Sequence, residues 1–235
     1  MPVSEPSHAT VERVQFPAGP YQLEGELAYA DDADTLVGGI IIAGSHPLLG
    51  GNMHNNVVRG LGDGLAERGW ATLRFNYRGV GGSEGPRVDV ARHMAEFWET
   101  SHVSGEHDLW QDVQAGAEFL RSILVSKRPL VLIGYSFGCS LLPSICSAGA
   151  PAALVLIAPP LSKHDYSDYA TIRSPLLVIL SSDDFTVEPA RVREWFDPLP
   201  APKELIQAKL DNHFFRGHEA WLVETVVRFL QEHAR

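Results

Sequence analysis

The sequence predicts an α/β fold with a mostly parallel, doubly wound sheet and an antiparallel hairpin at its N-terminal end. Nearly continuous apolar runs recur along the chain, as expected for strands that are buried on both faces. Helical patterns separate these runs, which is typical of βαβ units. The first two strand patterns instead alternate with a period of two around Pro17-Ala18-Gly19-Pro20, as in a hairpin.

The elements follow in order along the chain. The hairpin strands are expected at residues 11–16 and 21–29, after a ten-residue segment with two prolines that is expected to fray. Later strands are expected at residues 36–43, 71–76, 130–135, 153–158, 176–180 and 204–210. Helices are expected at residues 56–68, 107–124, 137–148, 188–196 and 219–233. A length of 235 residues suits one such domain, so a single domain over residues 1–235 is expected.

Composition and charge exclude several classes of protein. The formal net charge is −10, whereas a nucleic-acid-binding surface needs clustered Lys and Arg, so no nucleic acid is expected as a partner. No run approaches the roughly 18 apolar residues of a membrane span, so no membrane association is expected. The first ten residues lack a basic start followed by an apolar run. A cytoplasmic location is therefore expected.

The strongest functional signal is Gly134-Tyr135-Ser136-Phe137-Gly138, which matches G-x-S-x-G. It directly follows an apolar strand pattern and precedes an apolar helix pattern. Such a turn holds a serine hydroxyl at the carboxyl end of a sheet, and its glycines leave room for neighbouring chain. The start of the helix also aims backbone N–H groups at a reacting oxygen. We interpret Ser136 as a nucleophile and the Phe137 N–H as one oxyanion donor.

The loop after the first parallel strand should supply the second oxyanion donor. Pro47 in this loop has no N–H and cannot donate. His46 and Leu48 remain as the alternatives, and Leu48 is preferred. A later glycine-rich segment, residues 79–85, lacks the G-K-[ST] of a phosphate-binding loop and is interpreted as a structural turn.

Segments spread over most of the chain resemble one family. They are His46-Pro47-Leu48-Leu49-Gly50-Gly51-Asn52-Met53, Leu73-Arg74-Phe75-Asn76-Tyr77-Arg78-Gly79-Val80-Gly81-Gly82-Ser83-Glu84-Gly85, the pentapeptide around Ser136, Ala158-Pro159-Pro160 and Asn212-His213-Phe214-Phe215. On these motifs the chain resembles the small, lidless α/β-hydrolases, relatives of dienelactone hydrolases and short-chain esterases. The resemblance implies the α/β-hydrolase fold without a large cap domain, esterase-like hydrolysis, and a Ser–Asp–His triad.

The resemblance also implies which residues complete the triad. The family places an acid after the strand at residues 176–180, three residues before a valine, which selects Asp184 and leaves Asp183 as the alternative. The base belongs in the loop after the last strand, which selects His213 over His218 at the start of the final helix. Asp184 would then orient His213, and His213 would activate Ser136.

One connection is longer than usual. Residues 85–106 form an insertion that is expected to hold a short helix and a loop near the site, where it could cover the substrate. Trp110, Tyr166 and Trp195 are expected to line the substrate pocket. The chain has no H-E-x-x-H or Cys–His metal spacing, so no metal and no other cofactor are expected.

Together these features predict a carboxylesterase-like serine hydrolase that cleaves esters or thioesters through an acyl-enzyme. The expected partner is a small-molecule ester or acyl substrate, and the protein is expected to be a monomer or a small homo-oligomer. Two alternatives stay open. The same triad could serve an acyltransferase or a peptidase, or the fold could belong to a non-catalytic binding protein.

Overall fold

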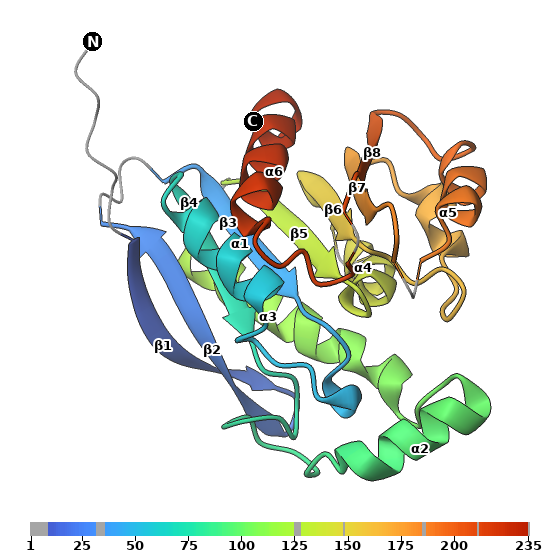
Figure 1. The fold of residues 1–235 in the computed structure, drawn as a ribbon. Helices are drawn as coiled ribbons and strands as arrows, with labels where there is room; N and C mark the ends of the chain where they lie inside the picture. Colours follow the sequence, from blue (N-terminus) through green and yellow to red (C-terminus); the bar gives the residue numbers. More distant parts are fainter. Residues whose placement is uncertain are drawn as a thin grey trace.

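The structure, a computed structural model, describes residues 9–31, 36–124, 128–147, 149–184, 187–210 and 212–234. Within these ranges one eight-stranded sheet has the order β1-β2-β4-β3-β5-β6-β7-β8 (Figure 1). Its strands are β1 Ala9–Ala18, β2 Tyr21–Ala30, β3 Gly38–Ala43, β4 Trp70–Phe75, β5 Leu130–Tyr135, β6 Ala153–Ile157, β7 Leu176–Ser181 and β8 Lys203–Ala208. β2 pairs antiparallel with β1 and β4, and all other neighbours are parallel. The predicted hairpin and mostly parallel sheet are confirmed.

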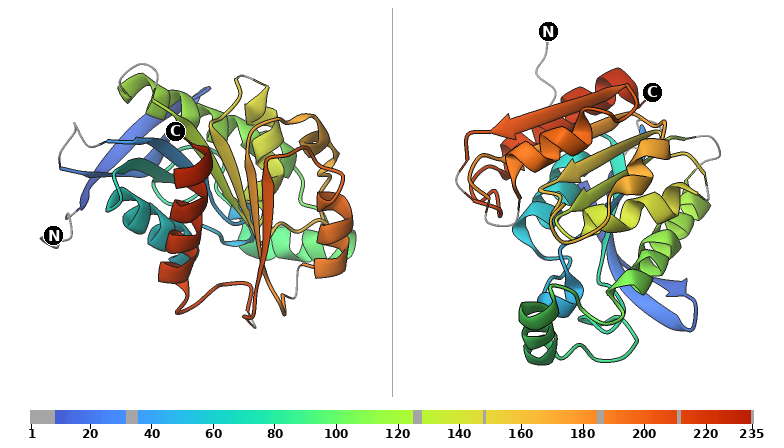
Figure 2. Two further views of the ribbon diagram at one scale, coloured as in Figure 1. Left: turned by 90° about the horizontal axis from the view of Figure 1, so that it is seen from above. Right: turned by 90° about the vertical axis from the view of Figure 1, so that its right-hand side faces the viewer.

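Helices cover both faces of the sheet (Figure 2). α1 (Asn56–Ala66) packs beside α6 (Glu219–His233), and α3 (Trp110–Ile123) packs beside α4 (Gly138–Cys146). β4 shows why the two pairs are separated. Its Arg74 approaches Gly62 of α1, whereas the adjacent Leu73 approaches Gly116 of α3. Because neighbouring strand residues point to opposite faces, α1 and α3 lie on opposite sides of the sheet.

The core follows the apolar runs. β3, β4, β5, β6 and β7 are buried along their whole length, as expected for strands between two helical layers. β8 is only partly buried and is the edge strand beside α5 (Pro189–Phe196). None of the helices in the described ranges has the length and apolar character needed to cross a membrane.

Two boundary predictions are wrong. The first strand already includes Ala9 and Thr10, and the Thr10 hydroxyl donates a hydrogen bond to Asp31, so these two residues do not fray. Residues 1–8 lie outside the described ranges. The helix expected to begin at residue 107 begins at Trp110, because a 3₁₀ turn, η3 (Glu106–Leu109), precedes it.

The insertion at residues 85–106 contains α2 (Val90–Thr100), which projects from the body of the molecule in Figure 1. The Asp89 side chain caps its N-terminus by accepting the Arg92 N–H. α2 buries none of its residues fully, and it packs against η2 (Pro47–Leu49) in the loop after β3. The connection from β6 to β7, residues 158–175, holds only the short 3₁₀ helix η4 (Ser167–Thr171). No cap domain is inserted there.

A proline inside α4 ties η4 to the helix that follows Ser136. Pro143 has no N–H, so the carbonyl of Cys139, four residues earlier, lacks its helical donor. The Tyr169 hydroxyl of η4 takes that place and donates to the Cys139 carbonyl at 2.6 Å, in a fully buried position. The hydroxyl thereby satisfies a backbone acceptor that could not reach water.

Tyr169→Phe is therefore expected to lower the free energy of unfolding by about 1–3 kcal/mol, because it leaves the Cys139 carbonyl buried without a partner. Tyr166→Phe is the matched control. The Tyr166 hydroxyl is also buried but has no hydrogen-bond partner among the described residues, so its removal should cost little. Urea unfolding of the two variants checks this. Equal losses in both would contradict the role given to Tyr169.

Candidate active site

Ser136 lies in a sharp turn between β5 and α4. Its φ of 53° is in the left-handed region, which is strained for a serine. The flanking glycines are required by close contacts. A Cβ on Gly134 would lie 2.7 Å from backbone atoms of Cys139, and one on Gly138 would lie 2.1 Å from the Ala43 carbonyl oxygen. The G-x-S-x-G pattern is thus explained by packing between β5, α4 and the end of β3.

The structure brings Ser136, His213 and Asp184 into one hydrogen-bonded chain. His213 Nε2 lies 3.1 Å from Ser136 Oγ, and His213 Nδ1 lies 2.8 Å from Asp184 Oδ2. The histidine and aspartate side chains are 6% and 0% exposed. An ionised Asp184 can only accept, so Nδ1–H donates to it and Nε2 is left to accept the serine proton. This is the geometry of a general base beside a nucleophile.

The parallel strands explain why residues so far apart in sequence meet. Ser136 follows β5, Asp184 follows β7 and His213 follows β8, and the carboxyl ends of parallel strands lie at one edge of the sheet. The buried Tyr135 hydroxyl donates to the His213 carbonyl at 3.3 Å. Burial raises the pKa of Tyr135, and the Asp184 charge adds to the effect, so this hydroxyl keeps its proton.

The rival residues from the sequence lie elsewhere. Asp183 is exposed, and its backbone N–H donates to the Leu210 carbonyl. His218 is exposed at the start of α6, where its backbone N–H donates to the Phe215 carbonyl. The carboxylate that contacts His213 is therefore Asp184, and the imidazole that contacts Ser136 is that of His213.

The loop after β3 packs directly against the nucleophile turn. The Gly138 N–H donates to the Gly44 carbonyl at 3.1 Å, and the His46 ring stacks on the Phe137 ring with centroids 4.1 Å apart. The next part of the loop turns away into η2, where the N–H groups of Leu49, Gly50 and Gly51 donate to the carbonyls of His46 and Pro47. Leu48, the preferred second donor, is partly exposed in η2. The structure thus places His46, the other alternative, beside Phe137.

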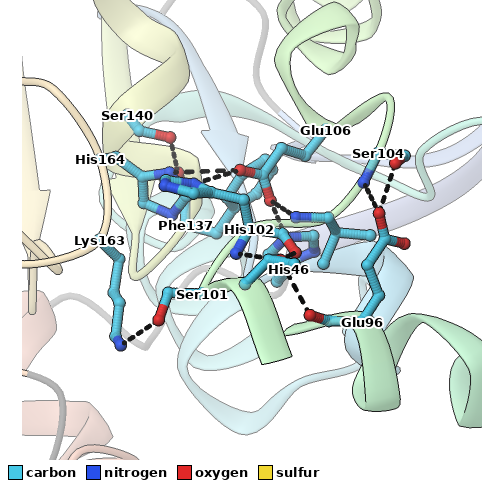
Figure 3. Close-up of polar contacts among 12 residues, drawn as sticks. His46, Glu96, Ser101, His102, Ser104, Glu106, Phe137, Ser140, Lys163 and His164 are labelled. Atoms are coloured by element: carbon cyan, nitrogen blue, oxygen red, sulfur yellow. Dashed lines mark hydrogen bonds and ion pairs between the residues drawn. The ribbon is translucent and has the colours of Figure 1, made fainter. Parts of the chain in front are cut away.

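A buried carboxylate lies at the same place (Figure 3). Glu106 Oε2 is 2.9 Å from His46 Nε2 and accepts the Val103 N–H at 3.0 Å. Glu106 Oε1 is 3.4 Å from His102 Nδ1 and 3.8 Å from His164 Nδ1. Burial alone would raise the pKa of Glu106, but the hydrogen bond from His46 and the neighbouring imidazoles hold that pKa below its ordinary value. Glu106 is therefore a carboxylate at neutral pH.

Glu106 belongs to none of the sequence motifs described above. It is separated from His46 by 60 residues, and no spacing rule joins a first-loop histidine to an acid at the end of an insertion. Among the described residues, no group of three or more His, Cys, Asp and Glu side chains is arranged to hold a metal ion. The cluster around Glu106 is a hydrogen-bonded polar network rather than a ligand set.

Two cavities, each of about 470 Å³, flank the loop after β6. Trp110 lines the first together with Phe137 and Leu141. Tyr166 and Trp195 line the second, and the Trp195 indole N–H donates to the Tyr166 carbonyl at 3.1 Å. The three expected pocket residues therefore do not share one pocket. The wall between the cavities includes His164 and Asp165, which line both.

His164 makes the stability of the protein depend on pH. The pKa of its imidazole is lowered from 6.5 to about 4. Burial is the main cause, the Glu106 charge opposes the shift, and His46, His102 and Lys163 add to it. The unfolded chain therefore takes up a proton between these values that the folded chain does not. The free energy of unfolding should fall as pH drops from 6.5 to about 4, by up to about 3 kcal/mol at 1.36 kcal/mol per unit.

The test compares urea unfolding of the wild type and His164→Gln across this pH range. The variant should lose less stability on acidification, because glutamine does not titrate. Parallel pH profiles of the two proteins would contradict a neutral, buried His164.

The chain is similar to a family of known hydrolases and to solved serine hydrolase structures. Residues 46–170 match the family described as "Serine aminopeptidase, S33". An uncharacterized protein of Rickettsia prowazekii is 27% identical over 206 residues, which are 83% of this chain and 78% of that protein. An alpha-beta serine hydrolase homologue from Coxiella burnetii is 28% identical, with a TM-score of 0.74 and coverage of 93% of this chain and 97% of that chain. A serine hydrolase without a lid from Xanthomonas campestris is 27% identical, with a TM-score of 0.73 and coverage of 97% and 96%.

The absence of a cap between β6 and β7 fits these neighbours, and the expected resemblance to lidless α/β-hydrolases is confirmed. The chain belongs to the serine aminopeptidase S33 family of α/β serine hydrolases.

Proposed function

We propose that the protein is a serine hydrolase that cleaves small carboxylic esters or thioesters through an acyl-enzyme on Ser136. One observation carries the proposal. His213 lies between Ser136 Oγ and a fully buried Asp184 carboxylate, at hydrogen-bond distance from each. A serine hydroxyl is a weak nucleophile until an oriented base removes its proton, and this chain supplies that base.

The proposed reaction has two halves. Ser136 Oγ attacks the acyl carbonyl while His213 Nε2 takes the hydroxyl proton. His213 then gives this proton to the leaving alcohol or thiol as the tetrahedral intermediate collapses to the acyl-enzyme. Water, deprotonated by His213, attacks the acyl-enzyme in the same way and releases the acid. Asp184 keeps Nδ1–H in place and stabilises the imidazolium in both halves.

The negative charge of each tetrahedral intermediate needs two backbone donors. We assign them to the N–H of Phe137, the N-cap residue just before α4, and the N–H of His46. His46 is chosen over Leu48 because its ring lies on Phe137, whereas Leu48 follows it into η2. The first cavity, which Phe137 lines, would accept the acyl or leaving group of a small substrate.

The experiment is labelling with a fluorophosphonate followed by peptide mass mapping. The expected result is one label, on Ser136. Turnover is then measured on a panel of aryl esters, alkyl esters and thioesters, with and without added alcohols as competing acyl acceptors. Products that form only with an acceptor would favour acyl transfer. No label on the folded protein would overturn the proposal and favour a non-catalytic binding protein.

A peptidase is the second candidate, because the family description names an aminopeptidase. The same triad would cleave an amide if His213 protonated the departing amine. Aminoacyl arylamides belong in the panel for this reason. Cleavage of these substrates faster than of matched esters would replace the esterase proposal.

A further inference from the structure

We propose that Glu106 is a positioning residue for the reaction, because its buried carboxylate holds the His46 imidazole against Phe137. Through that ring it fixes the loop that carries the second oxyanion donor. The inference rests on the proposed function, since an oxyanion exists only if Ser136 attacks an acyl group. The inference assigns the insertion at residues 85–106 a part in catalysis, because Glu106 is the last residue of that insertion and lies beside Phe137 and His46.

The contacts show how completely the carboxylate is engaged. One oxygen meets His46 Nε2 and the Val103 N–H, and the other meets His102 and His164. The Glu106 side chain is 11% exposed and that of His46 is 10% exposed. A hydrogen bond to a charged acceptor at such a buried place is stronger than one between neutral groups.

The His46 ring depends on this single polar contact. With Nε2–H donated to Glu106, Nδ1 carries a lone pair, and Nδ1 is buried without a hydrogen-bond partner among the described residues. If the carboxylate is removed, Nε2–H is also buried without a partner. Such a loss costs enough to drive the ring toward water and away from Phe137.

A displaced ring would move the backbone of the loop. The His46 carbonyl accepts the N–H groups of Leu49 and Gly51, and the Gly44 carbonyl accepts that of Gly138. His46 is thus fixed between the end of β3 and η2, and its ring packs on the residue that follows the nucleophile. A shift of the ring is passed to the His46 N–H, which must point at the reacting oxygen within a few tenths of an ångström to stabilise charge.

His164, in the loop after β6, supports the same arrangement. Its ring meets the Phe137 ring edge-on with centroids 5.3 Å apart, and its Nδ1 lies 3.8 Å from Glu106. Glu106 therefore links three segments around Phe137, namely the loop after β3, the end of the insertion and the loop after β6. A carboxylate that served only folding would not need to lie between the two rings that contact the residue after the nucleophile, Phe137.

The test compares Glu106→Ala with Glu99→Ala, an exposed glutamate on α2 of the same insertion. Loss of a whole oxyanion donor costs about 10²–10³-fold in kcat, so a displaced donor should cost about 10- to 100-fold. We expect that loss in kcat for Glu106→Ala, with KM within about threefold of wild type, and no loss for Glu99→Ala. The rate of fluorophosphonate labelling should fall by a similar factor, because phosphonylation of Ser136 uses the same donors.

Two further variants separate positioning from folding. Glu106→Gln keeps an acceptor for His46 Nε2–H and should recover most of the lost kcat. His46→Ala should lower kcat by a similar factor, and Glu106→Ala should add nothing to it, since both remove one unit. If Glu106→Ala does not fold, histidine ¹⁵N NMR of the wild type decides instead. It should show His46 as the Nε2–H tautomer, and an Nδ1–H tautomer would overturn the inference.

The outcomes distinguish this inference from the proposed function. A wild type that hydrolyses esters and labels on Ser136, together with a folded Glu106→Ala variant of unchanged kcat, would overturn only the inference. Failure of the wild type both to label and to turn over any substrate would overturn both. A variant that raises KM alone would make Glu106 a contributor to substrate binding and would also contradict positioning.

Discussion

Replacing Ser136 by alanine is expected to lower kcat for ester hydrolysis by about 10⁴-fold or more. The variant keeps the turn, the cavities and the His213–Asp184 pair, but it has no oxygen to form an acyl-enzyme. Removing the base in His213→Ala should cost about as much, because the two residues act as one unit. Initial rates on the best ester from the panel measure both effects.

Ser147→Ala is the matched control, because Ser147 is exposed at the C-terminal end of the same helix and lines neither of the two cavities. The kcat of this variant should stay within about twofold of wild type. The fluorophosphonate label should be lost in Ser136→Ala and kept in Ser147→Ala. Wild-type turnover by Ser136→Ala would show that another residue carries the chemistry.

Asp184→Asn is expected to lower kcat by about 10⁴-fold, the size of the effect when the corresponding aspartate of other Ser–His–Asp enzymes is changed. Asparagine can present an N–H to His213 Nδ1, which then becomes the acceptor. The proton moves to Nε2, where it faces Ser136 and prevents His213 from acting as a base. KM should change much less than kcat.

Asp183→Asn is the matched control, since it is the same chemical change one residue earlier. Asp183 is exposed, so the kcat of this variant is expected to stay within about twofold of wild type. Thermal unfolding of both variants shows whether each is folded before rates are compared. Loss of activity in Asp183→Asn with retention in Asp184→Asn would reverse the assignment of the acid.

The fold was largely predictable from the sequence because its signals are local. Apolar runs marked the buried strands, and β5 matches its expected bounds, residues 130–135. Errors arose where tertiary contacts decide. Ala9 and Thr10 look like a polar tail, but β1 pairs with β2 along its whole length and extends to Ala9. The helix at α3 starts late because Glu106 and its neighbours form a 3₁₀ turn toward the site.

The candidate site divides in the same way. Ser136 is identified by the local G-x-S-x-G pattern between a strand and a helix. The order of strands in the family indicates where the acid and the base should follow. The choice between His46 and Leu48 depends on which residue packs on Phe137, which no spacing in the sequence encodes. Glu106 is absent from any motif because its partners come from three distant segments. Trp110 and Trp195 look alike in sequence but line different cavities.

The position of the triad along the chain has a consequence for synthesis. Ser136 follows the fifth strand, but Asp184 follows β7 and His213 follows β8. Translation proceeds from the N-terminus, so Ser136 leaves the ribosome well before His213. The last helix, α6, then packs on α1, one of the first elements made. On the proposed mechanism, the nascent chain carries an unactivated serine until β7, β8 and the loop that holds His213 have also been translated, and reactivity appears only when these segments have folded.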